Sequence, residues 1–362
     1  MALELAQTHH WGRKDLDRNM LNEELCRPEQ ADRIRVAVIG GGANPEHNVG
    51  RISADAVASA LDDQKFTAVP FTIAQDGTWL DASSDPYPSF AAAIGDLETC
   101  DVAFPAVHGA PGEDGTLAGL CEVARIPYVG CSLAAGTFGM NKQVTKLIAN
   151  SLGVRTAPGI VLRSPADAVD VQLPVVVKPA TAGSSLGVSF IRKERQLAGA
   201  IEAAFKLSSE VLVESVATGR EIDIAVLETA DGRLHMGSPL EVVLGDQLFF
   251  DNATKYGGNS QSRCPAPLTD NERDQLFDAA RRMFRGMGCA GLARIDFFLT
   301  DTGPVLIEVN TMPGFTEHSQ YARMFGAQGI TFSQLLDALI MAALRRFTRP
   351  SEARSVTFSV TV

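Results

Sequence analysis

Short apolar runs alternate along the first third of the chain with segments of helical period. Residues 33–42, RIRVAVIGGG, form an apolar run that ends in glycines, which predicts a buried parallel strand leading into a loop. Residues 102–109 show the same pattern, and residues 53–63 and 116–126 have the spacing of amphipathic helices. Because strands that alternate with helices are typical of a parallel sheet, we expect an α/β layer here.

Further along the chain, several strands follow one another without an intervening helix. Residues 173–191 predict a strand, a glycine-rich loop and a second strand, and residues 291–310 predict two strands joined by a DTG turn. Residues 1–33 have no clear period and are expected to be an extension. The other predicted elements are strands at 210–216 and 220–228 and helices at 140–154, 272–288 and 332–347.

Composition narrows the class of protein. The chain has 362 residues, 45% of them hydrophobic, so two or three packed units are expected. A net charge of −11 argues against a nucleic-acid partner. The six cysteines include no CxxC pair, so neither a zinc site nor a disulfide framework is indicated. The start lacks the apolar core of a signal peptide, and no stretch approaches the roughly 20 apolar residues of a membrane helix. We therefore expect a cytoplasmic protein with no membrane partner.

The predicted hairpin at residues 291–310 carries the first candidate chemistry. Strand side chains alternate, so Glu308 and Asn310 lie on one face, and Asp296 lies at a comparable height on the paired strand. Two carboxylates and an amide oxygen are hard ligands, suited to magnesium shared with substrate phosphates. The alternative is that Asp296 and Glu308 flank a turn and are solvated.

Two other segments carry groups suited to a nucleotide. Lys178 ends a strand and precedes a Gly/Ser-rich loop, and a lysine beside exposed backbone N–H groups suits a polyphosphate. Glu214 ends another strand and Glu221 follows it, where carboxylates can accept hydrogen bonds from an adenine amino group and ribose hydroxyls. The alternatives are an ordinary flexible hairpin and solvated strand ends.

The order and spacing of the motifs resemble the D-alanine–D-alanine ligase family, which has the ATP-grasp fold and is related to the D-alanine–D-serine and D-alanine–D-lactate resistance ligases. The resemblance covers residues 34–348. Its motifs, in chain order, are GGGANPEHNV, AVHGAPGEDGTLAGL, MNKQVTK, VVVKPATAGSSLGVS, VLVESVATGREIDIAVL, KYGG, GLARIDFF and EVNTMPGFTEHS.

The resemblance implies the fold, the domains and the reaction. It implies an N-terminal α/β domain followed by two domains whose antiparallel sheets hold ATP between them. The reaction joins two D-alanines through an acylphosphate, for peptidoglycan precursors, cell wall and cell shape. ATP, two Mg²⁺ ions (with Mn²⁺ as a substitute), D-amino acids and a homodimer are the expected cofactors and partners. The expected ranges are an extension at 1–33, domains at 34–136, 137–214 and 215–348, and a tail at 349–362.

The resemblance also assigns roles to individual positions. Asp296, Glu308 and Asn310 match magnesium ligands, and Lys142 and Lys178 match lysines on the ATP phosphates. Arg294 and the Gly314 N–H match the oxyanion site. The remaining matches are Glu214 and Val216 at the adenine, Glu221 at the ribose, Lys255 and Tyr256 on a closing loop, Glu46 and Ser184 at the first amino acid, and Ser319 at the second carboxylate.

Three histidine and glutamine positions keep open alternatives. His47, expected in a loop, either orients substrate or bonds to the loop backbone, and His108 either lines the first-substrate pocket or is structural. Gln320 stands where relatives have an apolar residue. Its side chain either contacts the second amino acid and selects it, or points into solvent or bonds to the backbone. A hydrogen-bonding residue there favours a D-serine acceptor as the alternative to D-alanine.

Further departures and one more alternative remain. Relatives have serine at the positions of Asn44 and Gly50, and aspartate at the position of Asn141, which keeps an oxygen acceptor. These changes affect the first-substrate side and loop packing.

An inactive nucleotide-binding module is the alternative to a ligase, and it belongs to another functional class.

Overall fold

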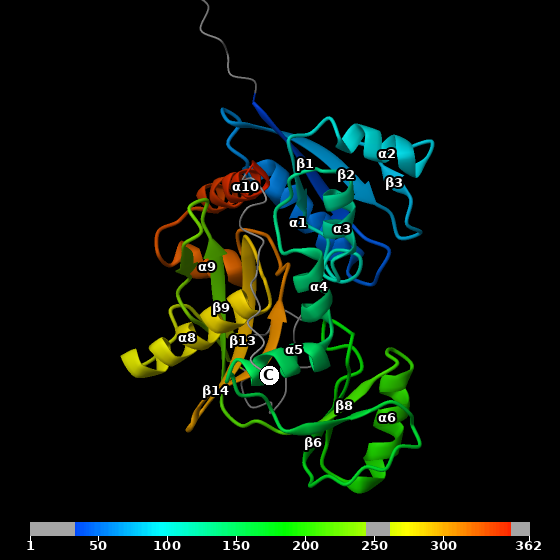
Figure 1. Ribbon diagram of the computed structural model, residues 1–362, viewed down its shortest axis with the longest axis vertical. Helices are drawn as coiled ribbons and strands as arrows, with labels where there is room; N and C mark the ends of the chain where they lie inside the picture. The colour runs from blue at the N-terminus through cyan, green and yellow to red at the C-terminus, as the bar shows by residue number, and fades with distance from the viewer. Residues whose placement is uncertain (1–32, 244–260, 349–362) are drawn as a thin grey trace, which may run out of the picture. The chain divides into compact units, whose positions relative to one another are not determined.

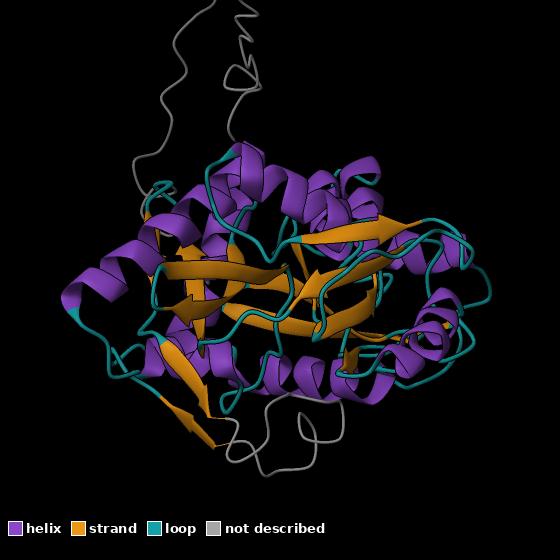
Figure 2. Ribbon diagram, turned by 90° about the horizontal axis from the view of Figure 1, so that it is seen from below, coloured by secondary structure: helices purple, strands orange, loops and turns teal. Residues whose placement is uncertain are grey.

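The computed structural model describes residues 33–243 and 261–348. The described residues from 34 to 348 form one compact unit, whose elements are organised around three separate sheets (Figure 1). Figure 2 shows helices on both sides of the strands. In the described part of the chain, none of the helices is long and apolar enough to span a membrane.

The first sheet is the predicted α/β layer. Its order is β3-β2-β1-β4, and β1 pairs in parallel with both β2 and β4, which confirms the buried parallel strand. A Cβ on Gly50 of α1 would lie 2.4 Å from the Gly41 carbonyl oxygen, so glycine permits this close helix–strand approach. The elements are β1 (Ile34–Gly41), α1 (His47–Ala60), β2 (Phe66–Ile73), β3 (Trp79–Leu80), α2 (Phe90–Leu97), β4 (Val102–Pro105) and α3 (Thr116–Val123).

The second sheet is antiparallel throughout, in the order β5-β8-β6-β7. Its buried face packs against α6, where Ile201 and Ala204 meet Val177 and Val213. The pair β6 and β7 is the predicted strand, loop and strand. The elements of this part are α4 (Leu133–Met140), α5 (Lys142–Ser151), β5 (Gly159–Leu162), β6 (Val175–Pro179), β7 (Ser189–Ile191), the 3₁₀ helix η1 (Glu194–Gln196), α6 (Leu197–Phe205) and β8 (Val211–Ser215).

The third sheet is also antiparallel, in the order β12-β11-β9-β13-β14, with β10 paired to β9. Helix α8 begins with a capping box between Thr269 and Glu272 and buries Leu276 and Phe284 against β9 and β13. Its elements are β9 (Arg220–Glu228), β10 (Leu234–Met236), β11 (Leu240–Val243), β12 (Gln261–Arg263), α8 (Asp270–Gly286), β13 (Leu292–Thr300), β14 (Gly303–Asn310), α9 (Gln320–Gly326) and α10 (Phe332–Thr348).

Candidate functional site

The loop after β1 differs from the sequence expectation. His47 is the first residue of α1, which begins six residues earlier than predicted, so the expectation of a loop position was wrong. The reason is a side chain: Asn44 Oδ1 accepts from the Glu46 N–H at 2.7 Å, while its Nδ2 donates to the His108 and Ala110 carbonyls. Asn44 thus ends the loop and ties it to the segment after β4.

The two histidines of this region are both held by the protein. His47 Nδ1 lies 3.0 Å from the Gly42 carbonyl oxygen, which is the backbone contact considered as its alternative role. His108 is buried, with Nε2 2.8 Å from Ser53 Oγ and Nδ1 3.1 Å from the Met312 carbonyl oxygen. Burial lowers the pKa of His108, but Glu113, the Met312 carbonyl and Glu46 together outweigh it and the pKa is raised.

The predicted hairpin is confirmed in its register. Asp296 on β13 stands opposite Glu308 on β14, and Arg294 stands opposite Asn310. A bulge after Asp296 shifts the register beyond this point, so the aligned polar pairs lie on the side of the bulge away from the turn. Asp296 is only 4% exposed, which rules out the solvated alternative for this residue.

Arg294 is fixed between carboxylates. Its Nε and Nη2 donate to the two oxygens of Asp296 at 2.8 and 2.7 Å, and Nε lies 3.8 Å from Asp223 Oδ2 on the neighbouring strand β9. Burial lowers the pKa of Arg294, but Asp296 and Asp223 outweigh it and the pKa is raised further. The result is a charged, rigid donor whose orientation is set before any substrate arrives.

Many of the predicted residues line one cavity of about 380 Å³. Glu46 and His108 reach it from the first sheet, Ser184 from the loop after β6, and Arg294 from β13. The others from the predicted set that line it are Lys142, Glu308, Asn310, Gly314, Ser319 and Gln320. Residues far apart in sequence therefore meet where a small polar substrate can bind.

Within the cavity, several polar groups are already paired. Ser184 Oγ donates to Glu46 Oε1. The backbone φ of Ser184 is +51°, a conformation that residues other than glycine rarely adopt. Lys142 Nζ donates to the Ala182 carbonyl at 2.9 Å and lies 3.5 Å from Glu308 Oε2. Lys142 thus connects the glycine-rich loop to β14.

The turn after β14 presents Gly314, Ser319 and Gln320 to the cavity. Ser319 Oγ accepts from the Thr316 N–H at 3.0 Å, and Ser319 is the N-cap residue of α9. Gln320, the first residue of α9, is half-buried and is among the residues that line the cavity. The side chain of Arg323, one turn later, also lines it and donates to Ser262 Oγ.

A group of charged side chains lies outside the cavity lining, on helix α5 and the second sheet. Lys178 Nζ on β6 is 2.6 Å from Glu214 Oε2 on β8, and Lys146 of α5 donates to the other oxygen, Oε1. Glu214 is 5% exposed, so the solvated strand end considered above is wrong for it. Burial raises the pKa of Glu214, but Lys178 and Lys146 outweigh it, and the pKa lies below its usual value.

Sequence reasoning missed Lys146, although a signal was present. Lys146 follows Lys142 by one helical turn in MNKQVTK, so both project from the same side of α5. Its partner Glu214 lies 68 residues further along the chain, so the pairing is not visible in the local pattern. Asp223 was missed for the same reason, because its contact with Arg294 crosses from β9 to β13.

Other predicted residues lie outside the cavity lining or outside the described residues. Val216 directly follows β8, and Glu221 is on β9 opposite Val242 and Phe298. Lys255 and Tyr256 fall outside the described residues. In the part of the chain that the structure describes, no three histidine, cysteine, aspartate or glutamate side chains cluster as a metal site.

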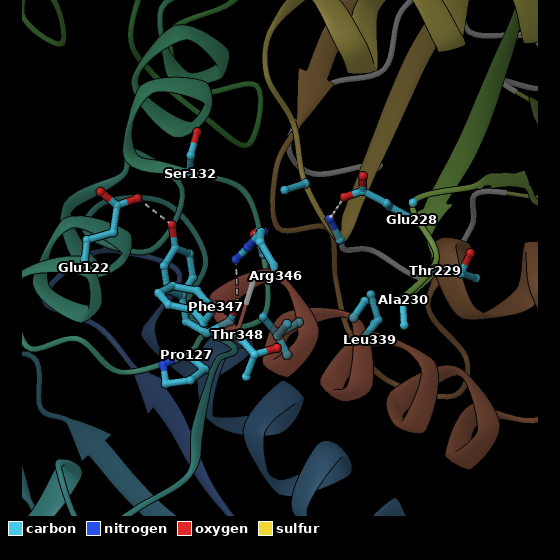
Figure 3. A pocket seen from close by; sticks show the side chains of 18 of the residues that line it. Glu122, Pro127, Ser132, Glu228, Thr229, Ala230, Leu339, Arg346, Phe347 and Thr348 are labelled. Carbon is cyan, nitrogen blue, oxygen red and sulfur yellow. Dashed lines mark hydrogen bonds between the residues drawn. The ribbon is translucent and has the colours of Figure 1, made fainter. Parts of the chain in front are cut away.

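A larger cavity, of about 940 Å³, is lined by none of the predicted residues. Arg346 of α10, one of the charged residues that line it, donates to the Gly130 and Tyr128 carbonyls and lies 4.9 Å from the Tyr128 ring centre (Figure 3). Because the predicted residues gather in the smaller cavity and none of them lines the larger one, the smaller cavity is the better candidate for the functional site.

Comparison with known proteins identifies the family to which the chain belongs. The family profile described as D-ala D-ala ligase C-terminus matches residues 164–341, and that described as D-ala D-ala ligase N-terminus matches residues 35–94 and 88–131. The D-alanine–D-alanine ligase of Corynebacterium urealyticum is 38% identical over 358 residues, covering 87% of this chain and 99% of that protein. That of Mycolicibacterium smegmatis is 37% identical over 361 residues, covering 87% and 97%.

Solved structures give the same result. The VanG D-Ala:D-Ser ligase from Enterococcus faecalis superposes with a TM-score of 0.75 at 31% identity, covering 86% of this chain and 99% of that one. The D-alanine–D-alanine ligase from Bacillus anthracis complexed with ATP gives a TM-score of 0.73 at 25% identity, covering 87% and 98%. The fold is therefore the expected ATP-grasp architecture, and the chain belongs to the D-alanine–D-alanine ligase family.

Proposed function

We propose that this protein joins two D-alanine molecules into D-alanyl-D-alanine for peptidoglycan precursor synthesis, with ATP converted to ADP and phosphate. Family membership supports the activity. The observation that carries the residue assignment is the single cavity, where Glu46, Ser184, Arg294, Gly314 and Ser319 meet beside Lys142 and Glu308.

The first step requires two anions to approach each other. The carboxylate of the first D-alanine attacks the γ-phosphate of ATP, which gives an acylphosphate and ADP. Lys142, which lines the cavity, and Lys178 are assigned to the ATP phosphates, where their ammonium groups would reduce the repulsion. Glu46, oriented by Ser184, supplies a carboxylate for the ammonium group of the first D-alanine.

The donor set on the hairpin fits magnesium. Asp296 and Glu308 face each other across β13 and β14, and each ionised carboxylate has lone pairs beyond those that Arg294 and Lys142 use. Asn310 adds an amide oxygen at the cavity. We assign these three residues to two Mg²⁺ ions, for which Mn²⁺ can substitute. Bound there, the metal would neutralise phosphate charge.

The second step forms the peptide bond. The neutral amine of the second D-alanine attacks the acylphosphate carbonyl, and the tetrahedral intermediate collapses by expelling phosphate while the nitrogen loses a proton. Arg294 and the Gly314 N–H are assigned to the oxyanion, and the rigid pairing of Arg294 with Asp296 supports a donor that needs no reorganisation. Ser319 is assigned to the carboxylate of the second D-alanine.

The other assignments rest on the resemblance. Glu214 and Val216 are assigned to the adenine, Glu221 to the ribose, and His47 and His108 to the surroundings of the first substrate. Lys255 and Tyr256 are assigned to a loop that closes over the phosphates.

D-Serine is the second candidate acceptor, because Gln320 lines the cavity next to Ser319. A partly buried amide gains from a substrate hydroxyl that can both donate and accept a hydrogen bond. D-Alanine offers only a methyl group at this place.

The family resemblance also supports a cytoplasmic homodimer. The five cysteines among the described residues are free thiols, in keeping with a reducing compartment. Light scattering at micromolar concentration tests the dimer, and a mass of one chain would contradict it.

The test of function mixes the protein with ATP, Mg²⁺ and D-alanine. We expect phosphate release that requires both Mg²⁺ and D-alanine, with D-alanyl-D-alanine as the product by mass. ATP binding without phosphate release would instead support the inactive nucleotide-binding module.

A further inference from the structure

The buried cluster of Lys146, Lys178 and Glu214 joins three elements, because α5, β6 and β8 contribute one residue each. The side chains of the two lysines are 15% and 13% exposed and that of Glu214 is 6% exposed. A carboxylate this buried requires a charged partner, and here it has one on each oxygen.

The two lysines are not equivalent. Lys146 Nζ is anchored twice, since it donates both to Glu214 Oε1 and to the Ala157 carbonyl oxygen at 2.6 Å. The ion pair of Lys178 within the described residues is with Glu214 alone, at 2.6 Å. Lys146 is therefore placed as a fixed partner of Glu214, while Lys178 is held by a single contact at the end of a strand that leads into the glycine-rich loop.

This asymmetry matters for ATP. In the proposed function, Lys178 binds an ATP phosphate, so it must weaken or leave its contact with Glu214. If Glu214 had no second partner, that movement would leave a buried carboxylate uncompensated, which is strongly unfavourable. With Lys146 in place, Glu214 keeps a short ion pair throughout the exchange.

We propose that Lys146 is a positioning residue: it holds Glu214 so that Lys178 can exchange from this carboxylate to a phosphate of ATP. Lys146 itself does not touch the nucleotide. Its removal should therefore weaken ATP binding through Glu214 and leave the later chemistry at the hairpin intact.

The first measurement is direct ATP binding, by calorimetry without D-alanine, for wild type and Lys146→Met. We expect the dissociation constant to rise about 10- to 100-fold, which corresponds to roughly 1.4–2.8 kcal/mol. At saturating ATP, kcat should stay within about threefold of wild type, and KM for D-alanine should not change. Lys206→Met, at an exposed lysine after α6, is the matched control and should bind ATP normally.

Rescue distinguishes positioning from a structural or direct role. In a Glu214→Gln background there is no buried carboxylate to hold, so adding Lys146→Met should change the ATP dissociation constant by less than about threefold. Lys146→Arg keeps the charge and should restore most of the affinity lost in Lys146→Met. If Lys146→Met does not fold, Lys146→Gln, which retains a donor for Ala157, takes its place in the same cycle.

Two results would overturn the proposal. One is ATP binding within twofold of wild type in Lys146→Met. The other is an equal loss of affinity in the wild-type and Glu214→Gln backgrounds, which would mean that Lys146 acts without Glu214. The proposal rests on the proposed function only for the role of Lys178 at ATP. If the wild-type protein binds ATP but makes no dipeptide, the proposed function is refuted. The double-mutant cycle of ATP dissociation constants still tests the role of Lys146 in that case.

Discussion

The hairpin of β13 and β14 and the cluster on β6 and β8 are both buried and charged, but their charge balance is opposite. Among the described residues at the hairpin, the three carboxylates of Asp223, Asp296 and Glu308 lie against two cations, Arg294 and Lys142. Such a region has an excess of negative charge and is suited to take up cations.

At the cluster, two ammonium groups share the single carboxylate of Glu214. This region has an excess of positive charge and is suited to take up an anion such as a polyphosphate. Lys142 contacts Glu308 of the hairpin and the Ala182 carbonyl in the glycine-rich loop after β6. Each region therefore holds its charged groups in place with internal ion pairs: a cationic ligand can replace the cation at the hairpin, and an anionic ligand can replace the carboxylate at the cluster.

The largest expected effect is at the hairpin. Arg294→Ala should reduce dipeptide formation by roughly 10²–10³-fold, because a preorganised donor to the oxyanion is lost. Binding of ATP should be spared. Arg294→Lys keeps the charge but cannot make the bidentate ion pair with Asp296, so most of the loss of dipeptide formation should remain. A variant that binds ATP poorly but turns over normally when saturated would reassign Arg294 to the nucleotide.

Removal of one carboxylate at the hairpin should come next. Glu308→Gln should lower the rate of phosphate release at least about 10²-fold and raise the Mg²⁺ concentration needed for half-maximal activity. The matched control is Glu317→Gln, at an exposed carboxylate outside the cavity. Near-wild-type activity in Glu308→Gln would contradict the two-metal assignment.

A smaller effect, on stability, is expected at the cluster. The pKa of Glu214 is lowered in the folded protein, so its ion pairs stabilise the fold above the unfolded pKa of about 4.3, and this contribution disappears as pH falls through the folded pKa. Glu214→Gln should cost about 1–3 kcal/mol at neutral pH. In urea titrations, the difference from wild type should shrink below about pH 4, and a difference independent of pH would contradict the ionised state.

The smallest effect concerns the acceptor. Gln320→Leu should shift the preference from D-serine towards D-alanine by about 5- to 30-fold in relative kcat/KM. The measurement is a competition between equal concentrations of the two amino acids, with products counted by mass. Gln64→Leu, at an exposed glutamine, serves as the control. An unchanged product ratio would show that Gln320 does not read the acceptor.

Elements that depend on local pattern were predictable from the sequence. The hairpin and the alignment of Asp296 with Glu308 follow from alternation and a DTG turn, and β1 follows from its apolar run. The helix predicted at 140–154 is present as α5, but it begins at Lys142, because the side-chain oxygen of Asn141 accepts from the Gln143 and Val144 N–H groups and caps it. The domain boundaries and the roles of the site residues stay predictions.

Elements that depend on distant contacts were not predictable. The early start of α1 depends on Asn44, whose side chain bonds to residues more than 60 positions away. Asp296 and Glu214 are buried rather than solvated because each has a cationic partner inside the fold. The partner of Asp296 is Arg294 in a buried strand, and Glu214 is paired with Lys146 on a distant helix. Sequence pattern shows which residues share a face, but the pairing of charges across elements requires the fold.

The transfer of oxygen from D-alanine to phosphate is the most direct test of dipeptide synthesis through an acylphosphate. D-Alanine labelled with ¹⁸O in its carboxylate is incubated with the protein, ATP and Mg²⁺, and the phosphate and dipeptide are analysed by mass. An acylphosphate route predicts one labelled oxygen in the phosphate for each D-alanyl-D-alanine formed, because the attacking carboxylate oxygen leaves with the phosphoryl group. Unlabelled phosphate, or phosphate formed without dipeptide, would contradict the account.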